Sequence, residues 1–465
     1  MGSRGPKYCL LCVGLLFCCS ELFAQFAPRE VITARTRREL EAEIPQAQST
    51  LMEWGGWIRF SVFDWDDPDG RDRGLQVTDP RVWLSLDYKE AHHIYARLRF
   101  TIVDFDHNDS STDREFWTES KVDQAFYRLT FDKLVESWGG VWSLPFRAEF
   151  KGGRQFLELG RGITFNQIND AMKMSAWGPT WDASSFYAWT IPDVHDLDTS
   201  WKNFDDGDRR YFGSQFIYKG IDKHELYAYM LIQRDHNSGK QFRQDFEYQS
   251  EHYGLGSRGE VVPNLEYYGE FIFEGGSSHN GFLSQIFNPG DGSAIRAYAL
   301  DFGLDYYFRT RYKPRVGFEY AFASGDPDRL SVTNTLFGNV HGQDNSFNYF
   351  GFADTGYALA PRLSNLQFFR ISGSVRPFEK TDCFDKMEWG VDLFWFLKDK
   401  PTGGISDFTA DTVSRYVGFE YGAYINWQPL SDVIATIRWA VFRPGTAYSD
   451  RDQRQYFGFD VTYTF

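Results

Sequence analysis

Basic side chains recur in this sequence at the polar positions of segments in which apolar and polar residues alternate. An arginine guanidinium is planar and pairs with a carboxylate through two parallel hydrogen bonds. If these positions face one aqueous cavity, they form a charged surface that selects carboxylated solutes. The basic candidates for such a surface are Arg59, Arg97, Arg99, Arg128, Arg147, Lys151, Arg154, Arg161, Arg315 and Arg438, and the acidic candidates are Glu319 and Asp392.

A second interpretation gives the same residues a structural role. Each arginine would then neutralise a neighbouring carboxylate and hold the shape of the protein. Further acids share these faces, and Glu266, Glu270 and Glu274 make one part of the surface acidic. The sequence leaves both interpretations open because it does not show which side chains meet.

Aspartate-rich segments offer a different chemistry. Runs of aspartate lie at 64–72, 104–113 and 193–208, and Ca²⁺ and Mg²⁺ prefer oxygen ligands. None of the runs has the spacing of an EF-hand loop, since Trp65 and Phe204 stand where an acid is needed. We therefore expect solvated acidic loops that face an anionic surface bridged by divalent ions. We expect no metal site and no cofactor.

Catalysis is the alternative from a different class of function. His92, His93, His236 and His195 beside Asp196 are candidate general bases. However, the sequence has no nucleophile elbow and no metal-ligand spacing. We expect a protein that is not an enzyme, and an enzyme with a site at the rim of a barrel remains the alternative, as does a purely structural or adhesive barrel.

The alternation itself predicts the elements that carry these side chains. In a strand, successive side chains point to opposite faces, so residues 455–465 present one aromatic face and one polar face. Eighteen segments repeat this pattern, an even number, and many have about the 9–11 residues that a tilted membrane-spanning strand needs. They are 54–64, 80–89, 92–104, 121–133, 145–156, 170–178, 182–190, 209–219, 223–234, 249–259, 264–274, 295–309, 311–324, 364–376, 386–398, 414–427, 432–443 and 455–465.

The connections between these segments alternate between short and long. Short turns join the second strand to the third, the eighth to the ninth and the sixteenth to the seventeenth. The long connections are 65–79, 105–120, 191–208, 235–248, 275–294, 325–363, 399–413 and 444–454. Short periplasmic turns and long extracellular loops are typical of outer-membrane barrels. Two links on the periplasmic side, 134–144 and 377–385, are longer than this rule predicts.

Composition agrees with a membrane barrel. Aromatic residues make up 18% of the chain, and aromatic rings form girdles at the two membrane interfaces of such barrels. Beyond the N-terminus no run of apolar residues is long enough for a spanning helix, so a membrane would be crossed by strands. The formal net charge of −15 argues against a nucleic-acid partner, because such partners need a basic stripe.

The N-terminus resembles an export signal. Arg4 and Lys7 precede an apolar stretch, and a cleavage site after Ala24 predicts a signal peptide over 1–24. A lipid anchor on Cys18 or Cys19 is the rival interpretation. Residues 25–52 are predicted to be a periplasmic lead, and residues 53–465 the barrel.

Several motifs are similar to the alginate-export family of outer-membrane porins. They are GGRQFLELGRGITFN at 152–166, WDASSFYAW at 181–189, YAFASGD at 320–326, FGN at 337–339 and YFGFAD at 349–354. The resemblance implies a monomeric barrel that passes a polyuronate or a related solute. It also implies a lumen lined by Arg and Lys among acidic residues.

The sequence therefore predicts an all-β transmembrane antiparallel β-barrel of about eighteen strands in the outer membrane of a Gram-negative-type cell. We expect a passive channel for a hydrophilic solute, with an anionic polysaccharide or uronate oligomer implied by the resemblance. A general or sugar-selective porin is the alternative. The expected partners are outer-membrane lipid and lipopolysaccharide, the anionic saccharide itself and periplasmic export proteins, with a monomer favoured over a trimer.

Overall fold

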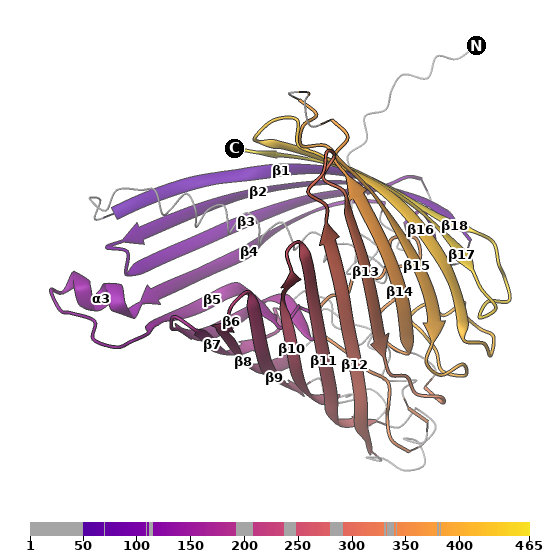
Figure 1. Ribbon diagram of the computed structural model, residues 1–465, viewed down its shortest axis with the longest axis horizontal. Helices are drawn as coiled ribbons and strands as arrows, with labels where there is room; N and C mark the ends of the chain where they lie inside the picture. The colour runs from indigo at the N-terminus through magenta and orange to yellow at the C-terminus, as the bar shows by residue number, and fades with distance from the viewer. Residues whose placement is uncertain are drawn as a thin grey trace.

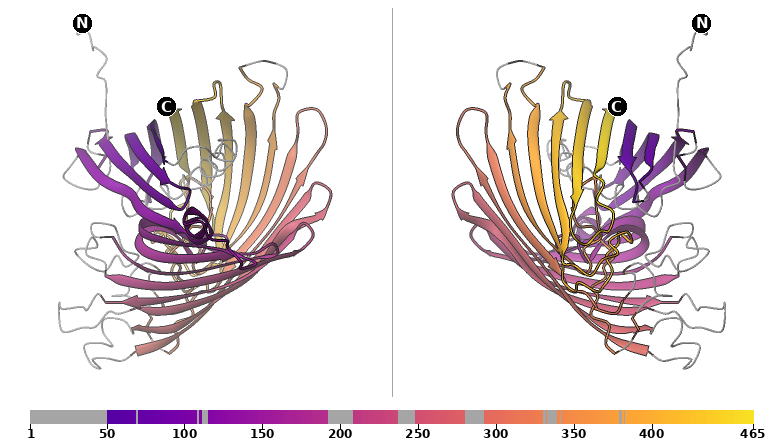
Figure 2. Two further views of the ribbon diagram at one scale, coloured as in Figure 1. Left: turned by 90° about the vertical axis from the view of Figure 1, so that its left-hand side faces the viewer. Right: turned by 90° about the vertical axis from the view of Figure 1, so that its right-hand side faces the viewer.

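The computed structural model is an eighteen-stranded antiparallel sheet that closes into a barrel (Figures 1 and 2). Strand order follows the chain, and β1 pairs with both β2 and β18. The prediction of one all-β barrel is therefore confirmed. The structure describes residues 50–465 apart from 69, 108, 111–114, 192–207, 237–247, 280–291, 330–331, 333–338, 341, 379–380 and 382.

Eighteen strands and one short helix make up the described secondary structure. The first half contains β1 (Thr50–Asp66), β2 (Asp72–Tyr88), β3 (His92–Phe105), β4 (Phe116–Thr130), α3 (Phe131–Ser137), β5 (Arg147–Leu159), β6 (Phe165–Trp177), β7 (Trp181–Trp189), β8 (Arg209–Ile221) and β9 (His224–Asp235). The second half contains β10 (Gln249–Val262), β11 (Leu265–His279), β12 (Gly292–Tyr307), β13 (Arg315–Ala323), β14 (Leu366–Val375), β15 (Glu388–Lys398), β16 (Tyr416–Trp427), β17 (Val433–Pro444) and β18 (Arg454–Thr464).

The predicted boundaries were wrong in two places near the start of the barrel. β1 begins at Thr50, within the predicted lead, and β2 begins at Asp72, so most of the predicted loop 65–79 is strand. Leu75 and Val77 are buried against Phe63 of β1, and this packing extends the hairpin. The predicted signal peptide 1–24 and the lead up to residue 49 lie outside the described residues.

Side chains alternate between the two faces of the wall as predicted. On β1, Trp54 and Ile58 are exposed, whereas Arg59 and Ser61 are buried. The exposed aliphatic and aromatic face is the outer one, because a membrane barrel turns its apolar side chains toward lipid. Among the described residues, no helix has the length and apolar character to span a membrane.

The β5–β6 hairpin leaves the wall part of the way along its length. β5 pairs with β4 only from Glu149 to Arg154, and β6 pairs with β7 only from Asp170 onward. Beyond these points β5 and β6 pair with each other up to Leu159 and Phe165, and Phe165 also forms a parallel bridge with Phe350 of the β13–β14 loop. The tip, residues 160–164, lies inside the barrel, where the Gly160 amide donates to Gln215 of β8 at 2.6 Å.

The barrel closes where the last residue meets β1. The Gly56 and Phe465 backbones exchange two hydrogen bonds, both of 3.0 Å. A Cβ on Gly56 would lie 2.3 Å from the Arg81 carbonyl oxygen and 2.8 Å from the Phe465 ring. Only glycine fits here without a shift of the neighbouring strands.

We expect Gly56→Ala to destabilise the closed barrel by about 1–3 kcal/mol, as overpacking typically does. The midpoint of urea unfolding in detergent micelles, followed by tryptophan fluorescence, measures this loss. The matched control is Gly373→Ala on β14, where the nearest atom to an added Cβ, the Arg315 carbonyl oxygen, is 3.6 Å away. Equal midpoints for the two variants would contradict this account of the closure.

Candidate functional site

Two segments fill part of the lumen and contact each other there. They are the tip of the β5–β6 hairpin and the described part of the β13–β14 loop (324–329, 332, 339–340 and 342–365), which lies within the ring of strands in Figure 2. The amides of Phe350 and Phe352 donate to the carbonyls of Thr164 and Gly162, both at 2.9 Å. Gly351 is required between them, since a Cβ there would lie 1.8 Å from the Gly162 oxygen.

Buried carboxylates on the wall hold both segments in place. Glu270 of β11 accepts hydrogen bonds from the hydroxyls of Tyr227 and Tyr229 and from the backbone amide of Arg161 at 2.8 Å. Glu274 lies four residues further along β11 on the same face, and it accepts a hydrogen bond from the amide of Asn348 at 2.7 Å. These glutamates therefore satisfy backbone groups of inward-folded segments that would otherwise be buried without partners.

A third glutamate fixes the far side of the loop. Glu420 of β16 is fully buried and accepts the amides of Tyr357 and Leu359 at 2.6 and 2.8 Å. The Tyr357 ring stacks on Tyr456 of β18 at 5.8 Å. Burial, together with the nearby Asp354 carboxylate, raises the pKa of Tyr357 above its ordinary value. The loop therefore crosses from the hairpin tip to the wall at β16 and β18.

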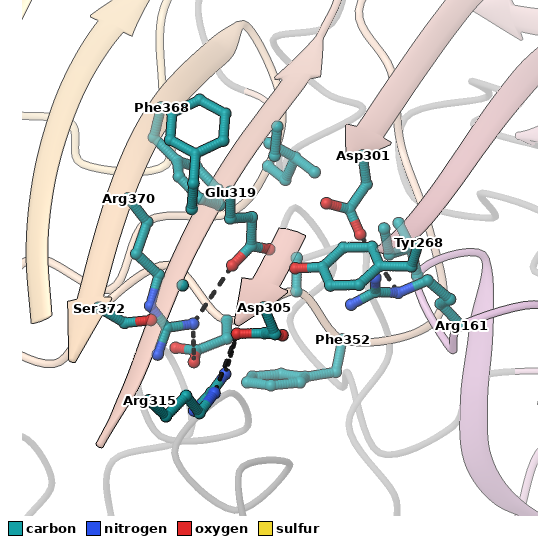
Figure 3. A pocket seen from close by; sticks show the side chains of 17 residues that line it. Arg161, Tyr268, Asp301, Asp305, Arg315, Glu319, Phe352, Phe368, Arg370 and Ser372 are labelled. Carbon is teal, nitrogen blue, oxygen red and sulfur yellow. Dashed lines mark hydrogen bonds and ion pairs between the residues drawn. The ribbon is translucent and has the colours of Figure 1, made fainter. Parts of the chain in front are cut away.

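A chamber of about 350 Å³ lies between the loop, the hairpin tip and β11–β14 (Figure 3). Arg370 lies on one side of it, with Nη1 2.9 Å from Asp354 and 3.3 Å from Glu319, and Nη2 2.9 Å from Asp392. Arg161 and Arg315 also line the chamber, where they pair with Asp301 at 3.4 Å and with Asp305 at 2.7 Å. Because each arginine faces at least one carboxylate, this chamber has no excess of positive charge.

The wall formed by β1–β4 has a different charge balance. Asp79 lies between Arg81 and Arg99, at 2.9 and 2.8 Å, and Asp123 lies between Arg81 and Arg97, at 3.0 and 2.5 Å. Arg59 adds its charge beside Asp79. The Arg81 and Arg97 guanidiniums also lie 5.5 and 5.2 Å from the centre of the Trp57 ring. Four arginines therefore lie around these two aspartates.

Three further cations stand directly opposite one another on the neighbouring strands. Arg128 of β4 is paired in register with Lys151 of β5, and Lys151 with Lys173 of β6. The Lys151 ammonium lies 3.6 Å from the centre of the Phe126 ring. Like charges directly opposite on a sheet destabilise it. These three basic side chains add positive charge to the lumen surface of β4–β6.

Eight of the ten predicted basic residues lie in three groups. Arg59, Arg97, Arg99, Arg128 and Lys151 point into the lumen from β1 and β3–β5. Arg161 and Arg315 line the chamber, and Arg438 of β17 pairs with Asp460 at 2.7 Å. The predicted acids Glu319 and Asp392 both contact Arg370, which the prediction missed.

Two of the predicted residues do not share this surface. Arg154 lies on the face of β5 opposite Lys151, at the bend of the hairpin, where it pairs with Asp170 at 2.9 Å and donates to the Val122 carbonyl of β4. Arg147 is exposed at the start of β5, 3.6 Å from Asp132 of α3. Both arginines therefore lie near the ends of the stretch in which β5 pairs with β4, and each is close to an aspartate.

Sequence reasoning also missed several charged residues of the lumen. Lys173 lies on β6 (Phe165–Trp177), whose sequence alternates only weakly between apolar and polar residues, and Asp123 occupies a β-bulge that shifts the register of β4. Asp79 lay before the predicted start of its strand at residue 80, and Arg81 lay one residue after it. Glu270 was assigned to an acidic part of the surface, but nothing in the pattern could indicate that it or Glu420 binds loop backbone.

The alternative chemistries receive no supporting geometry within the described residues. His93 pairs with Asp87 at 2.6 Å, and His92 contacts the Tyr127 hydroxyl at 2.7 Å. His195 lies in the segment that the structure does not describe. No group of three or more acids, histidines or cysteines in the described part of the chain is arranged to hold a metal ion.

Comparison with known proteins gives one family and a consistent fold. Residues 75–457 match the alginate export family. The crystal structure of Pseudomonas aeruginosa OccK5 (OpdH) is similar at 12% identity and a TM-score of 0.56, and covers 89% of this chain and 98% of its own. Acinetobacter baumannii OccAB2 is similar at 8% identity and a TM-score of 0.54, with the same coverage. These likenesses support the barrel fold alone. No curated protein matches the sequence.

We expect Glu420→Ala to loosen the β13–β14 loop, because the amides of Tyr357 and Leu359 then lose their shared acceptor. An unsatisfied buried donor costs about 1–3 kcal/mol. Single-channel recordings in a planar bilayer should show a larger and noisier conductance than the wild type. The control is Glu388→Ala, which removes an acid paired with Arg376 at the periplasmic rim. Unchanged recordings for Glu420→Ala would mean that other contacts hold the loop.

Proposed function

Because this chain belongs to the alginate export family, we propose that it conducts an anionic polysaccharide or uronate oligomer across the outer membrane. The family and the closed barrel support an outer-membrane channel. The nature of the solute is our proposal. It rests on the distribution of charge around the lumen.

The supporting observation is the cluster of basic side chains on the wall formed by β1–β6. Four arginines lie around Asp79 and Asp123 there, and the ladder of Arg128, Lys151 and Lys173 follows on the next strands. A polyuronate carries one carboxylate on each sugar ring, so consecutive rings could contact consecutive cations. Arginine suits this contact because its fork matches the carboxylate geometry.

The acids on the other side of the lumen do not cancel this surface. Glu270, Glu274 and Glu420 bind backbone amides of the inward-folded segments. Glu319 and Asp392 face Arg370. These carboxylates are therefore occupied within the protein, which supports a path for anions along β1–β6.

Several features of this function extend beyond the barrel itself. We propose that the chain is delivered to the periplasm by a signal peptide over 1–24, and that it works as a monomer. Export of a polymer would require periplasmic proteins that supply it to the short-turn end of the barrel. Lipid and lipopolysaccharide would surround the outer face.

The test replaces the cation ladder. We expect the wild-type channel to be anion-selective in a KCl gradient and to be blocked by oligouronate. A charge 4 Å from a carboxylate in water contributes about 1 kcal/mol, about fivefold in the dissociation constant. The variant Arg128→Gln/Lys151→Gln/Lys173→Gln should therefore shift the reversal potential toward cations and weaken the block by roughly 100-fold.

The matched control is Arg376→Gln, which removes a cation at the periplasmic rim that is paired with Glu388. It should leave the reversal potential and the block unchanged. Cation selectivity of the wild type without a block would contradict the polyuronate proposal. The acid-lined chamber would then favour a porin for neutral or cationic solutes.

A further inference from the structure

The connection between β4 and β5 differs from the other periplasmic turns. It contains α3 and then the uncharged stretch Trp138–Phe146. In Figure 1, α3 stands beyond the ends of β3 and β4. Trp138 and Val141 are 77% and 86% exposed, and Leu144 is 49% exposed. Large apolar side chains that are this exposed and this close in sequence indicate a surface that something covers.

α3 is fixed to the rim of the barrel, so the stretch that follows it has a defined place. The Thr130 amide donates to the Ala91 carbonyl at 2.9 Å, and Lys133 pairs with Glu90 at 3.0 Å. At the other end of the helix, the Gly140 amide donates back to the Val135 carbonyl at 3.0 Å. Trp138–Phe146 therefore cannot swing freely away from the wall.

A series of ring contacts joins the stretch to the outer face of the barrel. Trp142 and Phe146 contact each other at 6.5 Å, Phe146 contacts Trp181 of β7 at 5.9 Å, and Trp181 contacts Phe216 of β8 at 6.4 Å. Phe216 belongs to the apolar outer face and is 48% exposed. The stretch is thus continuous with the surface that faces lipid.

We propose that Trp138–Phe146 inserts into the inner leaflet of the outer membrane and acts as an interfacial anchor. Tryptophan settles at the level of the lipid headgroups because its ring is apolar and its N–H is polar. The absence of charge in the stretch removes the main cost of insertion. The Trp142 N–H is already satisfied by the Phe146 carbonyl at 2.6 Å.

The position of the anchor matches a weak seam of the wall. β4 and β5 share paired positions only from Ala125 to Thr130 on β4, at the end next to α3. No tight hairpin turn joins these strands. An anchor held in lipid beside this seam keeps their periplasmic ends together, so the hairpin can bend into the lumen without opening the wall.

The test places a fluorescent label on the stretch. Cys383 is exposed and is the only cysteine outside residues 1–24. In a Cys383→Ser background, Val141→Cys of the mature chain is labelled with bimane and reconstituted into phosphatidylethanolamine–phosphatidylglycerol vesicles. Interfacial segments lie roughly 5–10 Å deep at the boundary of headgroups and acyl chains. Lipids brominated near the headgroups should therefore lower the emission by at least half and deep bromines by less.

Two labelled positions serve as controls. Met172→Cys on the outer face of β6 should be quenched by bromines deep in the acyl chains, and Asp222→Cys in the β8–β9 turn should not be quenched. Leu144→Cys repeats the test if the Val141 variant folds poorly. Emission from position 141 or 144 that matches Asp222→Cys would overturn the proposal. The stretch would then be free in the periplasm for a protein partner. The result does not depend on which solute the channel carries.

Discussion

The pairing of β1 with β18 is the constraint on which the rest of the structure depends. In hydrocarbon each unpaired backbone group costs several kcal/mol, so a sheet in a membrane must close. Closure here joins residues near the two ends of the described chain, with Gly56 and Phe465 exchanging hydrogen bonds. The ring fixed in this way sets the size of the lumen and determines which side chains can meet across it.

The lumen of an eighteen-stranded barrel is wide enough to hold water unless protein segments fill it. Here two segments of the chain fill part of it. The β5–β6 hairpin and the β13–β14 loop bring backbone groups into the interior. Three wall glutamates, Glu270, Glu274 and Glu420, act as acceptors for those groups. These acidic side chains therefore hold the inward-folded segments in place. Basic side chains of β1–β6 also face the lumen.

The arginines differ in the contacts that they make. Arg370 and Arg438 pair with carboxylates of neighbouring strands or of the loop and hold the structure together. On β1–β4, by contrast, four arginines lie around Asp79 and Asp123. Arg128, Lys151 and Lys173 stand opposite one another on the next strands. Under the proposed function, the local arrangement of these charges matters more than the number of arginines.

The sequence by itself determined the barrel, the number of strands and most of their faces. The reason is that apolar and polar residues alternate along each strand, and this alternation can be read directly from the order of residues. It also indicated the family through short motifs at 152–166 and 349–354. Only the tertiary structure decided that these two motifs contact each other inside the lumen. It also decided which acids bind loop amides and which cations stand opposite each other. Those relations depend on register, bulges and the folding of loops across the barrel, which no local pattern of side chains encodes.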